Sequence, residues 1–221
     1  MKTYTSLALV VLLSASPSFV ACQSSGHEQA ESTGMHMDEL NASVAAAKAK
    51  IHACAESLAA VVEKGDLDPA PSFAQYKKDV AAVEAAASQS DSNLKSLQSK
   101  GQTYMAAWEK QAATITDPDL KKLAEERRAK LSQAVTAVAE AMQAAQAEIG
   151  PYRTQIKDME TYLSNDLTPA GISSIKDKSK QITKSSNSIG EALDKVAEAL
   201  SKGAPQFKTA KPPPPPEPAK K

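Results

Sequence analysis

The residue best placed for covalent chemistry is Cys22, which follows a short apolar stretch near the start of the chain. Residues 19–22 read Phe-Val-Ala-Cys. This resembles the bacterial lipobox, the motif in which a cysteine thiol receives a diacylglycerol group and becomes the new amino terminus. Phe19 departs from the motif, where leucine is usual. We expect residues 1–21 to be a cleaved signal peptide and Cys22 to be the site of lipid attachment.

The apolar stretch at residues 7–13 is typical of a signal peptide and is too short to cross a bilayer, which takes roughly 20 residues. Lipidation predicts a protein anchored in the bacterial cell envelope. Because Gln23 and not aspartate follows the cysteine, the outer membrane is the expected site, with the protein facing the periplasm. Ordinary secretory cleavage is the alternative, with Ser16 and Ser18 as small residues for it. It predicts a soluble periplasmic or secreted protein.

A soft-metal site is suggested by Met35, His36 and Met37, with His27 nearby. Thioether and imidazole groups are ligands that copper prefers. These residues fall in a polar stretch, 22–37, that shows no periodicity. We expect that stretch to be a flexible tether. A tether fixes no ligand geometry, so no metal site is predicted.

The other reactive side chains lack the neighbours that catalysis requires. His52 and Cys54 lie two positions apart, and such residues point to different faces of a helix. The acidic and basic side chains at residues 125–128 have the pattern of surface salt bridges. The sequence holds no HExxH, GxSxG, glycine-rich phosphate loop or paired CxxC motif. We therefore expect no enzyme activity and no cofactor.

The elements that hold these residues are indicated by apolar side chains that recur every three or four positions, the spacing of a coiled-coil seam. Four stretches follow it, over about residues 38–64, 72–115, 118–164 and 169–201. Asp117 and Thr168 are N-cap residues, each followed by a proline at the first helical position. Pro151 predicts a kink in the third helix. The expected fold is all-α, an elongated antiparallel bundle of four long helices.

Helix length predicts that the second and third helices extend beyond their neighbours, since each should approach about 65 Å. A two-helix hairpin over about residues 100–130 should therefore project from the bundle domain. Its aromatic and apolar residues are candidates for a partner surface, because tryptophan and tyrosine are favoured anchors at interfaces. Packing within the hairpin is the competing interpretation. The candidates are Tyr104, Met105, Trp108 and Ile115.

The bundle domain is expected to cover residues 38–202, followed by a tail over 203–221. The tail contains five consecutive prolines at 212–216 and four lysines against one glutamate, which is typical of a disordered, extended segment. Formal net charge over the chain is zero, so no overall field attracts nucleic acid. We expect no nucleic-acid partner.

Four short pieces occur in an order seen in a known family: Phe-Ala-Gln-Tyr at 73–76, Trp-Glu-Lys at 108–110, residues 142–151, and Tyr-Leu-Ser-Asn-Asp-Leu at 162–167. With them, the chain from about residue 65 to 202 resembles an uncharacterised bacterial family, domain of unknown function 2959. Members of that family look like exported coiled-coil proteins. The resemblance implies a helical exported protein and supplies no activity and no catalytic residue.

These patterns favour a non-enzymatic envelope lipoprotein that acts as a scaffold, spacer or accessory subunit. Its partner would be an unknown envelope protein or a second copy of the chain, and its membrane contact would be the lipid anchor at Cys22. The alternative is a helical-bundle module that binds a lipid or other apolar ligand in the periplasm. That function would require a cavity between the helices.

Replacing Cys22 tests the anchor directly. We expect Cys22→Ser to abolish fatty-acid incorporation and to release the protein from the membrane fraction, because the thiol is the acyl acceptor. Metabolic labelling followed by cell fractionation measures both effects. Cys54→Ala is the control and should change neither. Unchanged labelling of the Cys22→Ser protein would rule out lipid attachment at this residue.

Overall fold

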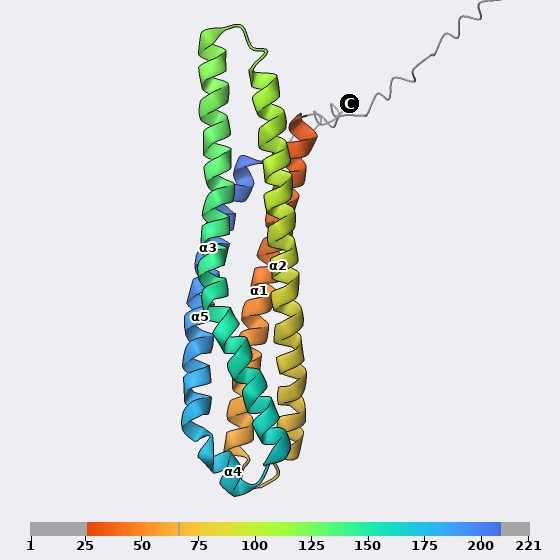
Figure 1. Cartoon of the computed structure of the whole chain (residues 1–221), viewed down its shortest axis with the longest axis vertical. Coiled ribbons are helices and arrows are strands. Elements are labelled where there is room, and N and C mark those ends of the chain that lie inside the picture. The colour runs from red at the N-terminus through yellow and green to blue at the C-terminus, as the bar shows by residue number, and fades with distance from the viewer. Residues whose placement is uncertain (1–25, 66, 209–221) are drawn as a thin grey trace, which may run out of the picture.

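The structure, a computed structural model, describes residues 26–65 and 67–208, and most of them are helical (Figure 1). The long helices are α1 (Gly26–Glu63), α2 (Ala70–Ala112), α3 (Pro118–Asn165) and α5 (Lys176–Gly203). A short helix, α4 (Pro169–Ser174), precedes α5, and a 3₁₀ turn, η1 (Ala204–Gln206), follows it. The described residues contain no strand. The prediction of an all-α, elongated antiparallel bundle is confirmed.

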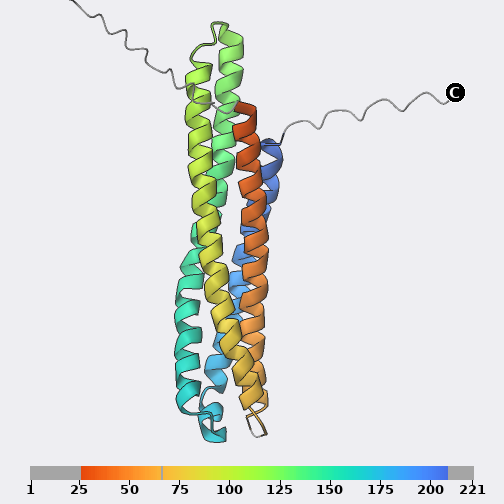
Figure 2. The ribbon, with the colours of Figure 1, turned by 90° about the vertical axis from the view of Figure 1, so that its right-hand side faces the viewer.

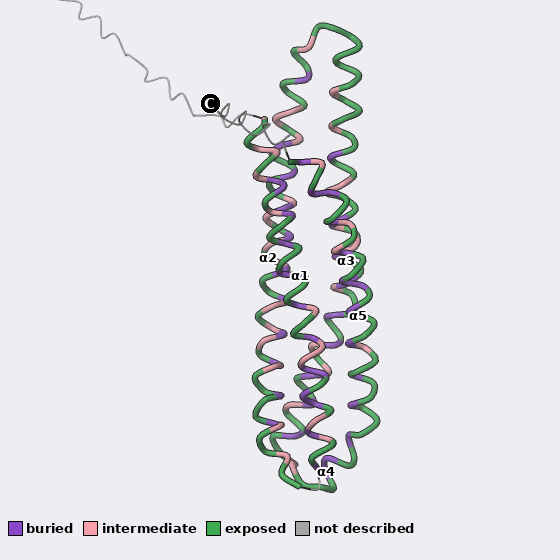
Figure 3. The backbone as a smooth tube through the Cα atoms, turned by 180° about the vertical axis from the view of Figure 1, so that it is seen from behind, coloured by how far each residue is buried: buried purple, intermediate pink, exposed green. Residues whose placement is uncertain are grey.

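Each long helix contacts two neighbours, so the bundle has a four-sided cross-section (Figures 1 and 2). α1 packs between α2 and α5, and α3 packs against the same two helices. The residues of the predicted seams are buried and form one continuous apolar core, as the inward-facing buried positions in Figure 3 indicate. Burial of this apolar stripe is the main source of stability for such helices.

Side-chain caps fix where two of the helices begin. The Asp117 carboxylate accepts hydrogen bonds from the backbone N–H groups of Asp119 and Leu120, each at 2.9 Å. The Thr168 hydroxyl accepts one from the Gly171 N–H at 3.1 Å. Each cap satisfies N–H groups that have no partner within the helix.

The predicted last helix, over 169–201, is divided in two. α4 ends at Ser174, and α5 starts after Ile175. The Ile175 N–H bonds the Ile172 carbonyl at 3.3 Å, a tighter turn than the α-helical one. Both isoleucines are buried. The break therefore lets two apolar side chains close this end of the bundle.

α3 is continuous through Pro151, as predicted for one bent helix. The proline ring lacks the N–H that would bond the carbonyl four residues earlier, which weakens the helix there. α3 changes direction in this part of its length (Figure 1). A Cβ atom at Gly150 would meet no other atom within 4 Å, so no close contact at this glycine causes the bend.

The expected tether over residues 22–37 is wrong for residues 26–37, which form the first turns of α1. Thr33, Gly34 and Met37 are buried there and continue the seam. The Thr33 hydroxyl is satisfied within the helix, because it donates to the Gln29 carbonyl at 2.9 Å. Polar and small side chains concealed this periodicity in the sequence. Residues 22–25 lie outside the described part of the chain.

The expected disordered tail over residues 203–221 is wrong for residues 203–208. Phe207 is only 1% exposed, and its ring meets the Tyr104 ring edge-on, with centroids 6.1 Å apart. The Arg127 guanidinium donates to the Gln206 carbonyl at 2.5 Å. A single apolar residue thus fixes the end of the bundle after α5. Residues 209–221 lie outside the described part.

The hairpin of α2 and α3 projects beyond the other helices, as expected (Figures 1 and 2), but its uncovered part is shorter than residues 100–130. Gly26 at the start of α1 lies in the same shallow pocket as Trp108 and Arg127. Because α1 and Phe207 cover α2 up to this level and Gly26 also lies beside the Gln111 side chain, the two helices are alone only over about residues 112–126. α2 itself ends at Ala112, before the predicted 115.

Removing the Phe207 ring should destabilise the bundle, because it leaves a cavity between Tyr104 and α1. We expect Phe207→Ala to lower the free energy of unfolding by about 3 kcal/mol, measured by urea denaturation. Lys184→Ala on the exposed face of α5 is the control and should change it by less than about 0.5 kcal/mol. Equal stability of the two variants would contradict the packing described for this segment.

Candidate functional site

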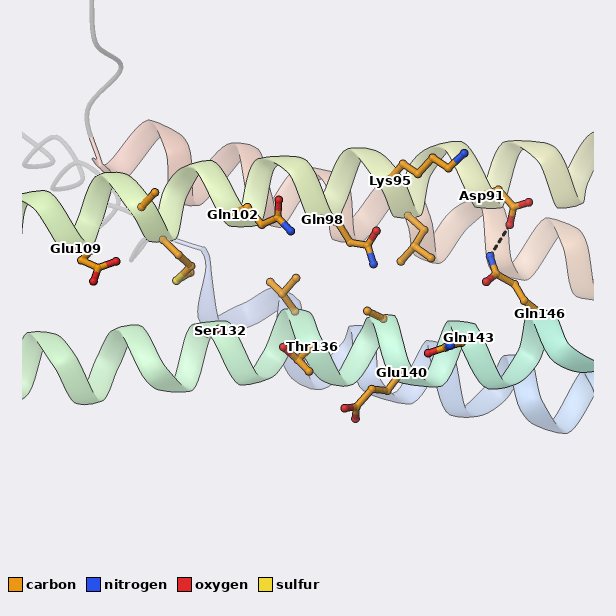
Figure 4. Close-up of a pocket in the computed structure, with 15 residues that line it drawn as sticks. Asp91, Lys95, Gln98, Gln102, Glu109, Ser132, Thr136, Glu140, Gln143 and Gln146 are labelled. Atoms are coloured by element: carbon orange, nitrogen blue, oxygen red, sulfur yellow. Dashed lines mark hydrogen bonds between the residues drawn. The ribbon is translucent and has the colours of Figure 1, made fainter.

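A groove of about 860 Å³ lies between α2 and α3 and is open to solvent on one side. It runs along residues 91–109 of α2 and 132–146 of α3, on the side of these helices that faces away from the core. Figure 4 shows α2 and α3 running along its two sides. Its apolar lining residues are Leu94, Met105, Ala106, Val135 and Ala139.

Polar bridges between α2 and α3 bound the groove at both ends. At one end the Gln146 amide donates to the Asp91 carboxylate at 2.6 Å (Figure 4). At the other end the Arg128 guanidinium donates to Glu109 at 3.2 Å. The same number of residues separates the bridges on each helix, which corresponds to a length of about 27 Å.

The floor of the groove is set by a close contact between the helices. A Cβ atom at Gly101 would lie 3.3 Å from both methyl groups of Val135. Glycine therefore allows the valine side chain to reach the α2 backbone. This contact closes the groove on the side of the core and leaves its outer side open.

The two walls keep the three-four spacing of a helix–helix seam, although no helix of the bundle covers them. The α2 wall consists of Asp91, Lys95, Gln98, Gln102, Met105 and Glu109. The α3 wall consists of Ser132, Thr136, Ala139, Gln143 and Gln146. Two parallel stripes with this spacing are the surface that a further helix requires.

Charge is confined to the ends and rim of the groove. Between Lys95 and Glu109 the α2 lining is uncharged. Figure 4 shows Gln98 and Gln102 directed toward α3, whereas Lys95 and Glu140 extend away from the space between the helices. The middle of the groove therefore offers neutral hydrogen-bonding groups and small apolar surfaces.

The predicted partner residues do not form one surface. Tyr104 is 6% exposed, and its ring packs against Trp108, with centroids 5.6 Å apart, and against Phe207. Trp108 is half-buried in the same cluster. Met105 faces the other way and lines the groove. Ile115 is partly exposed in the loop at the tip. The structure thus brings Tyr104 and Trp108 together as packing residues and separates them from Met105 and Ile115.

Sequence reasoning missed the groove because it followed only the buried seam. A second stripe with the same spacing could have revealed it. On α2, Gln98, Gln102 and Met105 form this stripe on the helix face next to the one that carries Leu94, Leu97 and Gly101. In a sequence, amide side chains at such positions are typical of a solvent-exposed helix face. Only the separation of α2 from α3 shows that they line a groove.

The cysteine in the described part of the chain is not reactive. Cys54 is fully buried, and burial raises the pKa of its thiol to about 12. Tyr76 and Tyr152 lie beside it, and burial raises the pKa of each phenol above its ordinary value. All three groups are neutral at physiological pH, and a thiol that stays protonated is a poor nucleophile.

The possible metal ligands do not converge. Met37 is fully buried, Met35 is 63% exposed, and His36 accepts or donates a hydrogen bond with Glu39 at 2.8 Å. His52 bonds the Ser186 hydroxyl at 3.1 Å. Among the described residues, no group of three or more His, Cys, Asp or Glu side chains is placed to hold a metal ion.

An enclosed cavity lies deeper in the core, between Val83, Ala87 and Met142, and has a volume of only about 10 Å³. The Ser90 hydroxyl at its wall is buried and has no hydrogen-bond partner among the described residues. A space of this size holds at most about one water molecule. In residues 26–65 and 67–208, no helix has the length and apolar character needed to cross a membrane.

An ion-pair cluster joins α2 to α3 beyond the Asp91 end of the groove. Arg153 donates two hydrogen bonds to the Glu84 carboxylate, at 2.8 and 2.7 Å, and Lys157 donates one at 2.7 Å. Chiefly because of the Arg153 hydrogen bonds, the pKa of Glu84 falls from 4.5 to about 2. The cluster holds the two helices together below the point where they diverge.

The lowered pKa of Glu84 predicts a pH-dependent contribution to stability. The contribution is complete above pH 4.5 and is lost as pH falls toward 2, because the unfolded chain binds the proton first. We expect Glu84→Gln to lower the free energy of unfolding by about 1 kcal/mol at neutral pH. The difference from wild type should shrink as pH falls from 4.5 toward 2 in urea titrations. Glu63→Gln, at an exposed position, is the control; a Glu84 effect independent of pH would contradict this account.

Comparison with known proteins identifies the family of the chain. No curated protein and no solved structure matches it. A family model described as "Protein of unknown function (DUF2959)" matches residues 19–205, which include all the long helices and most of the chain. The resemblance seen over residues 65–202 is thereby confirmed and extended toward the amino terminus. The chain belongs to this family of proteins of unknown function.

Proposed function

We propose that the protein is a non-enzymatic lipoprotein of the bacterial cell envelope that acts as a scaffold, spacer or accessory subunit through contact with another protein. The observation that carries the proposal is the groove between α2 and α3, with its two stripes at helix–helix spacing. Two helices that present such stripes can pack against a third helix. The occupant is a partner helix of about 18 residues, the length set by the two polar bridges.

The chemistry of the groove specifies the contact face of that helix. Gln98, Gln102 and Gln143 offer both donors and acceptors, and Ala106 and Ala139 leave room for close approach. A helix whose contact face carries amide, hydroxyl and small side chains satisfies these groups without burying a charge. Basic or acidic residues would fit only at the ends, near Glu109 or Lys95.

The dimensions of the bundle support a role as a spacer. α3 has 48 residues, which corresponds to a length of about 72 Å. One apolar core runs through the four-helix part, and side-chain hydrogen bonds join helices along its length. A long body with a continuous core holds its two ends at a fixed distance.

The envelope location and the lipid anchor are supported by the sequence around Cys22, at residues 19–22. Only a short stretch of chain separates Cys22 from Gly26, where α1 begins. The anchor would therefore hold the bundle close to the bilayer surface instead of on a long tether.

A binding module for a lipid or other apolar ligand has less support. The enclosed cavity in the core, of about 10 Å³, is far smaller than ligand pockets, which measure roughly 300–1,000 Å³. The larger groove is open and mixed in polarity. It suits a partner helix, which brings its own polar groups, better than an apolar small molecule.

Site-specific photo-crosslinking in living cells tests the groove as a partner site. We expect a crosslinker at Gln102, Ala106 or Thr136 to give one discrete product, because these positions face the groove. Thr103, exposed on α2 beside Gln102, is the matched control and should give none, as should Lys184 on α5.

The pattern of crosslinks distinguishes the occupants. Products that follow the groove positions and have a mass different from twice that of the chain indicate a partner protein. A product of twice the mass would assign the groove to a second copy of the chain. Equal products at Gln102 and Thr103, or none at any groove position, would contradict a helix bound in the groove.

A further inference from the structure

The start of α1 fixes how far the bundle can stand from a lipid on Cys22. Only residues 23–25 separate that cysteine from Gly26, the first residue described in α1. Even fully extended, this stretch spans at most about 14 Å. The end of the bundle that carries Gly26 therefore stays near the bilayer to which the lipid is attached.

The hairpin tip projects from this same end. Gly26 shares a shallow pocket with Trp108 of α2 and Arg127 of α3. From Arg127 back to Pro118, the first residue of α3, the helix rises about 14 Å. Figures 1 and 2 show the tip beyond the start of α1. The tip thus extends past Gly26 by about the length that the linker to Cys22 can cover.

The tip carries the features of a membrane-interface contact. Leu120 and Leu123 are 57% and 60% exposed and lie three positions apart, so they share one face of α3. Lys121 and Lys122, both exposed, lie between them in the sequence. Apolar side chains beside lysines are typical of helices that lie in the headgroup region of a bilayer.

The opposite end of the bundle provides a natural comparison. Leu67, in the loop between α1 and α2, is 81% exposed. It is separated from Gly26 by the whole of α1, whose 38 residues correspond to about 57 Å. Leu67 is too far from Cys22 to reach the same membrane when the bundle stands on its anchor.

We infer that the tip of the α2–α3 hairpin, through Leu120 and Leu123, inserts into the surface of the phospholipid bilayer that holds the Cys22 lipid. This inference rests on the lipid anchor of the proposed function. The anchor and the tip form two points of attachment, so the long axis of the bundle is oriented relative to the membrane. Lys121 and Lys122 face the phosphate groups of the lipids.

Environment-sensitive labels test the contact. The mature, lipidated protein is prepared with Leu120→Cys, Leu123→Cys, Leu67→Cys or Lys184→Cys and labelled with a thiol-reactive nitrobenzoxadiazole dye. Cys54 is fully buried and remains unlabelled in the folded protein. Each protein is placed in vesicles of phosphatidylethanolamine and phosphatidylglycerol that contain a spin-labelled lipid as quencher. Vesicle flotation, with Cys22→Ser as control, shows separately whether the lipid anchors the protein.

The expected result is a blue-shifted emission and several-fold stronger quenching at residues 120 and 123 than at 67 and 184. Introducing Leu120→Asp should weaken quenching at residue 123 while flotation is unchanged. Quenching at 120 equal to that at 67, in protein that floats, would overturn the tip contact and leave the anchor standing. Equal quenching at 184 would mean that the bundle lies flat, which also overturns the inference. Loss of flotation in the lipidated protein would overturn both anchor and contact.

Discussion

Two buried tyrosines in the half of the bundle nearer α4 set the register on which the other contacts depend. The Tyr76 hydroxyl donates to the Ile156 carbonyl of α3 at 2.7 Å, and the Tyr152 hydroxyl donates to the Ile51 carbonyl of α1 at 3.0 Å. Both phenols are fully buried, so a shift of either helix would leave a polar group without a partner in the core. Small side chains opposite, Cys54 and Ser186, give the two rings their space.

From this layer toward the tip, α2 and α3 become less tightly joined. Tyr76 and the Glu84 cluster hold them together first, the Asp91–Gln146 bridge follows, and along the groove beyond it they meet through the Gly101–Val135 contact. Amide and small side chains line the open side of this stretch beside Leu94, Met105 and Val135. Large core residues such as Leu97, Tyr104 and Val138 continue along the inner side of this stretch, where α1 and Phe207 pack against the hairpin.

Much of the fold could be predicted from the sequence, because helical spacing and caps are local signals. Asp117 and Thr168 cap the helices they were expected to cap, and the seams are buried. The tether and the tail were mispredicted because their order depends on distant contacts: Gly34 accommodates Phe207, and Phe207 packs on Tyr104. The candidate site depends on the separation of two helices, which no local pattern encodes. Of the four residues proposed as a partner surface, Met105 lines the groove and Tyr104 lies in the core.

The buried thiol of Cys54 can be used to measure how often the helices of the bundle separate. Because the side chain is fully buried in the layer that contains Tyr76 and Tyr152, a thiol reagent can reach it only when that layer separates. The rate of its modification then measures how often the core opens at this layer, independently of fraying at the hairpin or at the helix ends. A partner or a membrane that steadies the bundle would be visible as slower modification of a residue it never touches.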